Sequence, residues 1–158
     1  MKKSSISDLL IYVISAELVG AVSAVFAGGF SDFFVKYAKP PLLPPGWLFP
    51  VVWVILYAVM GISAYLIHSA NSPSSKDALV IYWAQLFVNF WWSIIFFRFE
   101  ALWAAVVTIA VLWLLILTMI VKFSRIKPLA GKINIPYFIW VTFAAYLNIA
   151  TAVINTNR

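Results

Sequence analysis

The chain has 158 residues, of which 65% are hydrophobic, 18% aromatic and only 10% charged. A soluble domain carries about 25% charged residues, so this composition excludes a surface that faces water throughout and fits one membrane-embedded domain. The lack of cysteine excludes disulfides and cysteine-ligated metals, and a net charge of +6 in so apolar a chain indicates orientation in a membrane, with no nucleic-acid partner.

Five stretches of the chain reach the length of about 20 predominantly apolar residues that a membrane-spanning helix needs. They cover residues 9–30, 47–67, 78–97, 101–121 and 133–154. The first follows Lys2 and Lys3 as a signal peptide would, but it is too long and contains Glu17, so it is expected to be a retained span. The sequence therefore predicts an all-α integral membrane protein, a bundle of five transmembrane helices in one domain of residues 1–158.

The first span carries small residues at every fourth position, a spacing that lets another backbone approach closely. These residues are Ala16, Gly20, Ala24 and Gly28. The neighbour is either another helix of the bundle or a second chain in a homodimer, and the sequence leaves both open. Glu17 lies near the middle of this span, where a carboxylate is costly, so it is expected to be protonated or paired with a polar group of another helix.

The first connection runs into the second span through the stretch KPPLLPPGWLFPVVW, residues 39–53, which contains five prolines. Proline fixes its own φ angle and restricts the residue before it, so the approach to the second span is expected to be extended and rigid. A helix-start signal accounts for Pro45 or Pro50 but not for all five prolines.

At 100° per residue, the second, third and fifth spans each collect aromatic rings on one face, and the third and fifth add amides. The faces comprise Trp53, Tyr57, Met60 and Ala64, then Tyr82, Gln85, Asn89, Trp92 and Phe96, then Tyr137, Trp140, Ala144, Asn148, Thr151 and Asn155. Amides within a bilayer are expected to face the bundle. Either they hydrogen-bond between helices while the rings fill the core, or rings and amides together line a pocket for a flat, largely apolar ligand.

Five spans place the two termini on opposite faces of the membrane. The face with the amino terminus carries seven basic residues: Lys2, Lys3, Lys76, Lys122, Arg125, Lys127 and Lys132. The other face carries four: Lys36, Lys39, Arg98 and Arg158. The positive-inside rule therefore predicts a cytoplasmic amino terminus. Near span ends, Trp47, Trp83 and Trp103 are expected to lie at the membrane interface.

Three of the spans carry motifs that occur together in one known family. Around the second span they are Lys39-Pro40, Pro44-Pro45-Gly46-Trp47, Phe49-Pro50, Trp53, Leu56-Tyr57 and Met60-Gly61. The third has Gln85-Leu86, Asn89, Trp92 and Phe96-Phe97, and the fifth has Pro136-Tyr137, Trp140, Phe143-Ala144 and Leu147-Asn148. On these motifs, across residues 30–155, the chain resembles the tryptophan-rich sensory protein (TspO/MBR) family, which includes the mitochondrial translocator protein, or peripheral benzodiazepine receptor.

Two positions depart from the family pattern. Phe33 and Phe34 stand where the family usually has Trp-Tyr, so weaker stacking is expected in the first connection. The cholesterol-recognition pattern requires Lys or Arg within five residues of a tyrosine, and none follows Tyr146 at that distance. This departure argues against a sterol role and suits a member from the membrane of a bacterial cell.

The resemblance implies a membrane receptor or sensor that binds tetrapyrroles, such as protoporphyrin IX or haem, and similar flat ligands between its helices, beneath a first connection that covers the mouth. The implied ligand-binding residues are Pro45, Phe49, Trp53, Tyr57, Gln85, Asn89, Trp92, Tyr137, Trp140, Ala144 and Asn148. Lys36 and Lys39, near the mouth, are candidates to meet ligand propionates. No metal or resident cofactor is expected, and His68 is expected to be an interfacial residue and not a haem ligand.

Two other functions stay open. Family members are associated with light- and oxygen-dependent breakdown of protoporphyrin IX, and under that interpretation Trp53 and Trp140 are the catalytic residues. The sequence itself shows no nucleophile–base pair, metal cluster or cofactor motif. A porphyrin transporter is the third possibility, although the sequence shows neither repeated halves nor broken helices in the middle of a span.

Overall fold

The computed structural model describes residues 5–156, in which every regular element is a helix. The elements are α1 (Ile6–Ala27), α2 (Phe30–Lys36), α3 (Leu48–Ser69), α4 (Ser75–Ser93), the π-helix η1 (Ile94–Arg98), α5 (Leu102–Ile126), α6 (Pro128–Lys132) and α7 (Ile135–Thr156). Within these residues, five helical segments are long and apolar enough to cross a membrane. The predicted five-helix membrane bundle is therefore confirmed.

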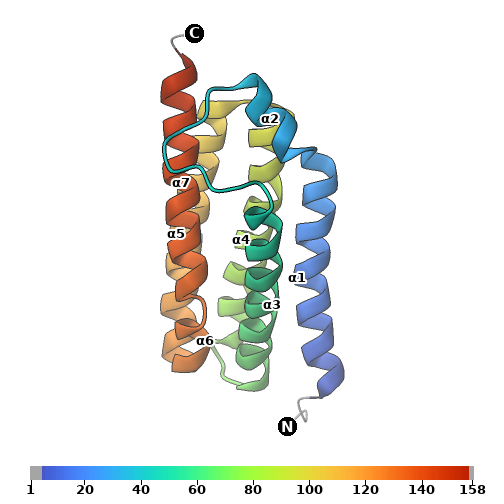
Figure 1. Cartoon of the computed structure of the whole chain (residues 1–158). Coiled ribbons are helices and arrows are strands. Elements are labelled where there is room, and N and C mark those ends of the chain that lie inside the picture. Colours follow the sequence, from blue (N-terminus) through green and yellow to red (C-terminus); the bar gives the residue numbers. More distant parts are fainter. Residues whose placement is uncertain (1–4, 157–158) are drawn as a thin grey trace.

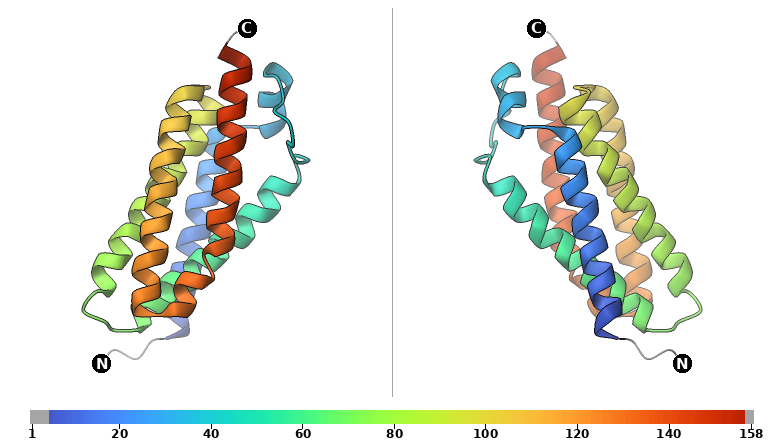
Figure 2. Two further views of the ribbon diagram at one scale, coloured as in Figure 1. Left: turned by 90° about the vertical axis from the view of Figure 1, so that its left-hand side faces the viewer. Right: turned by 90° about the vertical axis from the view of Figure 1, so that its right-hand side faces the viewer.

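The long helices form one bundle with distinct ends (Figure 1). The amino-terminal end of α1 lies at the same end as α6 and the α3–α4 connection, whereas α2 and residues 37–47 lie at the end where α7 finishes. Helix α1 packs on α3, and α5 packs on α4 and α7. Helix α3 runs obliquely across the bundle beneath the loop of residues 37–47 (Figure 2).

Helix α1 begins and ends at recognisable signals. The Ser5 hydroxyl accepts a hydrogen bond from the Asp8 N–H at 3.2 Å, and the Asp8 carboxylate accepts one from the Ser5 N–H at 3.1 Å, which forms a capping box. The helix stops at Ala27 because Gly28 adopts φ 84°, outside the helical region. Helix α1 thus ends three residues before Phe30, where the predicted first span ends, and the apolar segment that could cross the membrane continues through α2 to Lys36.

The first connection is partly helical. Its proline-rich half, residues 37–47, has no helix, in agreement with the prediction, but α2 was not predicted. Helix α2 is held by aromatic packing on η1, where the Phe33 ring lies 4.8 Å from the Phe96 ring and 5.3 Å from the Phe97 ring. These contacts between distant segments stabilise a helix of seven residues that would be marginal alone.

Two later helices extend beyond their predicted ends. Helix α5 continues to Ile126, because Lys122 and Arg125 suit the carboxyl-terminal turn of a helix and their long side chains reach the interface. After Ser93 the third span continues as the π-helix η1. A π-turn contains an extra residue, which changes the faces on which the following side chains lie and is not visible in the apolar pattern.

The basic residues that the structure describes divide between the two ends of the bundle in the predicted groups. Lys2, Lys3 and Arg158 lie outside the described residues. The structure places Lys76, Lys122, Arg125, Lys127 and Lys132 at the end with α6, and Lys36, Lys39 and Arg98 at the end with α2. The side chains of Trp47, Trp83 and Trp103 are exposed, as residues of an interfacial belt would be.

Helices α1 and α3 approach each other closely at glycines. A Cβ atom at Gly61 would lie 2.5 Å from the Cα of Val13, and one at Gly20 would overlap the Tyr57 ring. Ala16 is fully buried beside them. The first half of the small-residue stripe thus faces α3 of the same chain, whereas a Cβ at Gly28 would meet no described residue within 4 Å. The homodimer stays a prediction.

Replacing Gly61 with alanine is expected to lower thermal stability, because the added methyl must displace the α1 backbone at a cost of about 1–3 kcal/mol. Thermal unfolding in detergent measures this effect. Val54→Ala, at an exposed position of the same helix, is the matched control and should stay within about 0.5 kcal/mol of the parent. Equal stability of the Gly61 variant and the parent would contradict the close approach.

Candidate ligand-binding site

The centre of the bundle contains a hydrogen-bonded network of two tyrosines and two amides. The Asn89 side-chain N–H₂ group donates to the hydroxyls of Tyr57, at 3.1 Å, and Tyr137, at 3.3 Å. The Tyr137 hydroxyl in turn donates to the Gln85 carbonyl at 2.7 Å. All four side chains are buried. Because a bilayer offers no water to these groups, the network ties α3, α4 and α7 together.

A second polar link lies closer to the loop end of the bundle. The Trp92 indole N–H donates to the Asn148 carbonyl at 3.0 Å, and the Asn148 N–H₂ group donates to the Leu102 backbone carbonyl at 3.3 Å. Together with Gln85 and Asn89, this amide makes hydrogen bonds within the bundle. The amides therefore play the helix-linking part that was one of the two interpretations of their pattern.

An inner cavity of about 290 Å³ lies beside the network, between α1, α3 and the α4–η1 segment. Its aromatic lining consists of Phe30, Phe49, Trp53, Tyr57, Trp92 and Phe97. Helix α1 contributes only small residues, namely Gly20, Ala24 and Ala27, and Gly28 follows directly after the helix. Gly46, Pro50 and Ser93 complete the lining. The centroid of the Trp53 ring lies 5.6 Å from that of Tyr57 and 6.3 Å from that of Trp92, so three of the lining rings lie close together.

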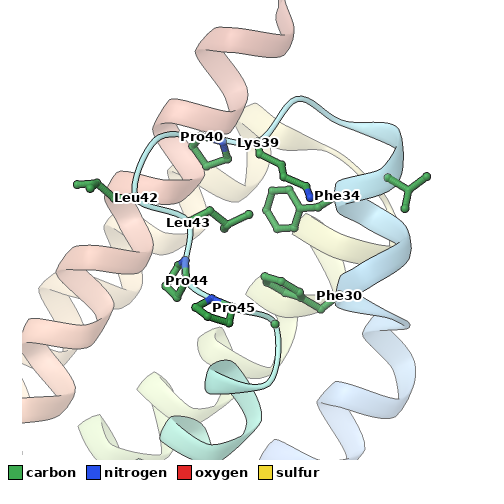
Figure 3. Close-up of a pocket in the computed structure, with 10 residues that line it drawn as sticks. Phe30, Phe34, Lys39, Pro40, Leu42, Leu43, Pro44 and Pro45 are labelled. Atoms are coloured by element: carbon green, nitrogen blue, oxygen red, sulfur yellow. The ribbon is translucent and has the colours of Figure 1, made fainter.

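A second space, which we name the loop pocket, lies between α2 and the proline-rich loop and has a volume of about 720 Å³ (Figure 3). It is lined by Phe30, Phe34, Val35, Lys39, Pro40, Leu42, Leu43, Pro44, Pro45 and Gly46. Figure 3 shows Phe30 and Phe34 directed into this space from α2, and Leu43 from the loop. The loop pocket shares Phe30 and Gly46 with the inner cavity, so the two spaces adjoin.

The carboxyl end of α2 is linked through Glu100 to the connection between η1 and α5, and we call the contacts of Lys36 and Tyr37 with Glu100 the clasp. The Lys36 ammonium forms an ion pair with the Glu100 carboxylate, and the Tyr37 hydroxyl donates to the same oxygen at 2.8 Å. The hydrogen bond from Lys36, followed by that from Tyr37, lowers the pKa of the Glu100 carboxyl below its ordinary value. Because the ion pair is largely exposed, solvent screens it.

The proline-rich loop is also fixed by α7. Asn155 holds both backbone groups of Ala38: its carbonyl accepts from the Ala38 N–H at 2.9 Å, and its N–H₂ group donates to the Ala38 carbonyl at 3.2 Å. The Tyr146 hydroxyl donates to the Pro41 carbonyl at 3.1 Å. The loop is therefore hydrogen-bonded to α7 at Ala38 and at Pro41.

Sequence comparison identifies the family. The sequence model of the TspO/MBR family matches residues 11–154. The chain belongs to the TspO/MBR family. This TspO/MBR protein is 33% identical over 153 residues to the protein CrtK of Rhodobacter capsulatus, across 96% of this chain and 94% of the relative. It is 35% identical over 127 residues to a tryptophan-rich sensory protein of Cereibacter sphaeroides, across 80% and 79%. It is 31% identical over 119 residues to the translocator protein of Ovis aries, across 73% and 70%. The resemblance inferred from the motifs is thus confirmed.

In this TspO/MBR protein, five of the predicted ligand-binding residues line the two adjoining spaces. Phe49, Trp53, Tyr57 and Trp92 line the inner cavity, and Pro45 lines the loop pocket. Gln85 and Asn89 lie in the hydrogen-bonded network and line neither space. The aromatic residues of α3 and α4 therefore lie together, as their shared faces predicted. The amides Gln85 and Asn89 lie outside the lining, in the hydrogen-bonded network beside the inner cavity.

The predicted residues of α7 lie elsewhere. Tyr137 and Asn148 are buried in polar links to α4, and Ala144 is buried in the core. The Trp140 ring packs on Phe49, with ring centroids 5.6 Å apart, and lines a groove between α3 and α7 outside the inner cavity. These polar links occupy the space between α4 and α7, whereas the inner cavity lies on the side of α3 and α4 that faces α1.

The prediction missed the residues that α1, η1 and the loop give to the inner cavity. The small residues of the first span were interpreted as a contact surface, but Ala24 and Gly28 border the inner cavity. Phe97 depends on the π-helix and Phe30 on α2, neither of which leaves a signal in the apolar pattern. The small-residue spacing was the one signal that could have indicated this wall.

Glu17 and His68 do not line the inner cavity. Glu17 is partly buried on α1 and lies near enough to Tyr57 to interact with it electrostatically. His68 packs against Tyr12, with ring centroids 5.5 Å apart, at the end of the bundle opposite the loop pocket. The position of His68 disfavours a role as haem ligand in either space.

Replacing Glu100 with glutamine is expected to accelerate amide hydrogen exchange in residues 37–47 roughly two- to fivefold at neutral pH, because the clasp loses its charge. The lowered pKa of Glu100 sets the pH dependence. In the parent, the clasp contributes fully above the ordinary glutamate pKa of about 4.3 and is lost as the pH falls through the lower folded-state value.

Asp77→Asn, at the opposite end of the bundle, serves as the control for this measurement and should leave exchange in residues 37–47 unchanged. If the exchange rates of residues 37–47 in the Glu100 variant equal those of the parent at neutral pH, the hydrogen bonds from Asn155 and Tyr146 are sufficient to hold the loop.

Proposed function

We propose that this TspO/MBR protein is a membrane receptor or sensor for flat, largely apolar ligands of the tetrapyrrole class, such as protoporphyrin IX or haem. The observation that carries the proposal is the aromatic inner cavity, in which Phe49, Trp53 and Trp92 present rings opposite the small side chains of α1. Aromatic rings that line a cavity favour a flat ligand, because offset stacking and edge contacts need broad planar surfaces.

The dimensions of the two spaces support a ligand that occupies both. Ligand pockets commonly measure about 300–1,000 Å³, and the inner cavity alone, at about 290 Å³, is at the lower limit. The adjoining loop pocket adds about 720 Å³ next to Phe30 and Gly46. A ligand larger than the inner cavity therefore has room to extend beneath the loop.

Polar recognition within the inner cavity is limited by the network behind it. The Asn89 N–H₂ group and the Trp92 indole N–H already donate to side chains of the protein. Binding in this space thus relies on stacking and apolar contact, which allows a range of flat ligands. The name of the Cereibacter sphaeroides relative, a sensory protein, supports the receptor part of the proposal.

The proposal includes an orientation, with the α6 end of the bundle in the cytoplasm and the loop pocket on the opposite side of the membrane. The support is the excess of lysine and arginine at the α6 end, where Lys122, Arg125, Lys127 and Lys132 lie in adjacent segments. Basic residues close to span ends favour retention on the cytoplasmic side.

Filling the inner cavity is the direct test of the binding site. Ala24→Phe places a ring in the space against α1 and is expected to weaken protoporphyrin IX binding by about tenfold or more. Ala21→Phe, at an exposed position of the same helix outside the lining, is the matched control. Tryptophan-fluorescence quenching on folded protein measures both. Equal affinities of the two variants would refute this location.

A second candidate function is light- and oxygen-dependent degradation of protoporphyrin IX. It is favoured by the position of Trp53, an oxidisable indole that lines the inner cavity and lies 6.2 Å from the Tyr137 ring and 5.6 Å from the Tyr57 ring. An illuminated porphyrin bound there would generate oxidising species from molecular oxygen next to these electron-rich rings.

Phenylalanine keeps a flat apolar surface but resists oxidation, so Trp53→Phe is expected to retain most of the porphyrin binding and to lose most of any light-dependent conversion. Trp140→Phe should have a smaller effect, because Trp140 lies outside the inner cavity. The porphyrin absorption spectrum under illumination, compared at matched occupancy, measures conversion. Conversion by the Trp53 variant at the parent rate would leave this function without residue-level support.

A further inference from the structure

We propose that the loop pocket recognises a carboxylate at the edge of the ligand, and that the Lys39 ammonium is its counter-charge. This inference rests on the proposed function and narrows its ligand class to flat apolar acids, as distinct from neutral flat molecules. The pocket would hold the acidic edge while the apolar body of the ligand lies in the inner cavity.

The position of Lys39 is the first support. Its side chain lines the loop pocket, and Figure 3 shows it extending from the loop toward Phe34, on the opposite wall. It is the one charged residue in that lining, as far as the described residues show. Among residues 5–156, no carboxylate lies within salt-bridge distance of it. Its charge is therefore available to a ligand.

The neighbouring basic residues are placed differently. Lys36 is engaged by Glu100 and by the face of the Tyr37 ring, whose centroid lies 5.3 Å from the ammonium nitrogen. Arg98, at the end of η1, lines neither the inner cavity nor the loop pocket. Of the two lysines that the sequence placed near the mouth, the structure thus leaves Lys39 to meet an anion.

The walls of the loop pocket offer an anion few hydrogen-bond donors, so the charge of Lys39 is the main feature that could bind it. Pro40, Pro44 and Pro45 have no backbone N–H to donate, and Phe30 and Phe34 offer only rings. An anion beside these walls would lose hydration and find few other donors, which costs free energy unless a cation compensates. Lys39, an exposed residue of this lining, supplies that compensation.

The junction of the two spaces sets the shape of the ligand. Because they share Phe30 and Gly46, one molecule can contact Trp53 with its body and reach the loop with its edge. A Cβ atom at Gly46 would lie 3.3 Å from the Phe30 ring, so a side chain there would narrow the junction. A planar acid with its carboxyl group on one side fits this arrangement.

The test compares protoporphyrin IX with its dimethyl ester, which has the same ring but no negative charge, in an uncharged detergent. Lys39→Gln is expected to weaken binding of the free acid about three- to tenfold and to leave binding of the ester unchanged. Lys39→Arg, which keeps the charge, should bind the acid like the parent. Raising the salt concentration should weaken the parent's binding of the acid but not of the ester.

Lys36→Gln is the matched control, because it removes the same charge from the same segment and opens the Glu100 clasp. Any effect of this variant should be equal for the acid and the ester. This inference would be overturned if the parent bound the acid and the ester equally well and if Lys39→Gln bound the acid like the parent. That result would leave the proposed function intact. Failure of both porphyrins to bind the parent would overturn the proposed function and this inference with it.

Discussion

The hydrogen bonds that Asn89 makes to Tyr57 and Tyr137 are the constraint on which the rest of the bundle depends. Within a bilayer there is no water to satisfy a buried amide, so the three side chains must be held together. Because they belong to α4, α3 and α7, one donor group fixes three helices. The Tyr137–Gln85 bond completes the closure of α4 against α7.

The hydrogen-bonded side chains fill the space between α4 and α7, and the inner cavity lies on the α1 side. Helix α1 approaches α3 closely at Gly61 and at Gly20, and its later small residues then border the inner cavity. The same stripe thus packs against a helix at one end and makes room for a ligand at the other. Tyr57 joins the two regions, since its hydroxyl belongs to the network and the residue also lines the cavity.

The proline-rich loop of residues 37–47 covers the ligand space at the end of the bundle where α7 finishes. Its prolines limit the conformations that it can adopt. Glu100 attaches it to the η1–α5 connection, and Asn155 and Tyr146 attach it to α7. A segment that is already ordered loses less conformational entropy when a ligand binds beneath it. Stacking in the inner cavity and charge recognition by Lys39 under the loop would therefore act on different parts of one ligand, with the amides committed to holding the helices.

By itself the sequence determined the five spans, the shared faces of α3 and α4 and the family, because apolar length, the helical repeat and motif spacing are local properties of a chain. Only the tertiary structure decided the partners of Gln85, Asn89 and Asn148, the α1 side of the cavity and the formation of α2 and η1. Those outcomes depend on contacts between residues far apart in the chain, such as Asn89 with Tyr137 and Tyr37 with Glu100. An amide on a predicted inward face has several partners within reach, and only the packed helices determine which one it binds and where space remains.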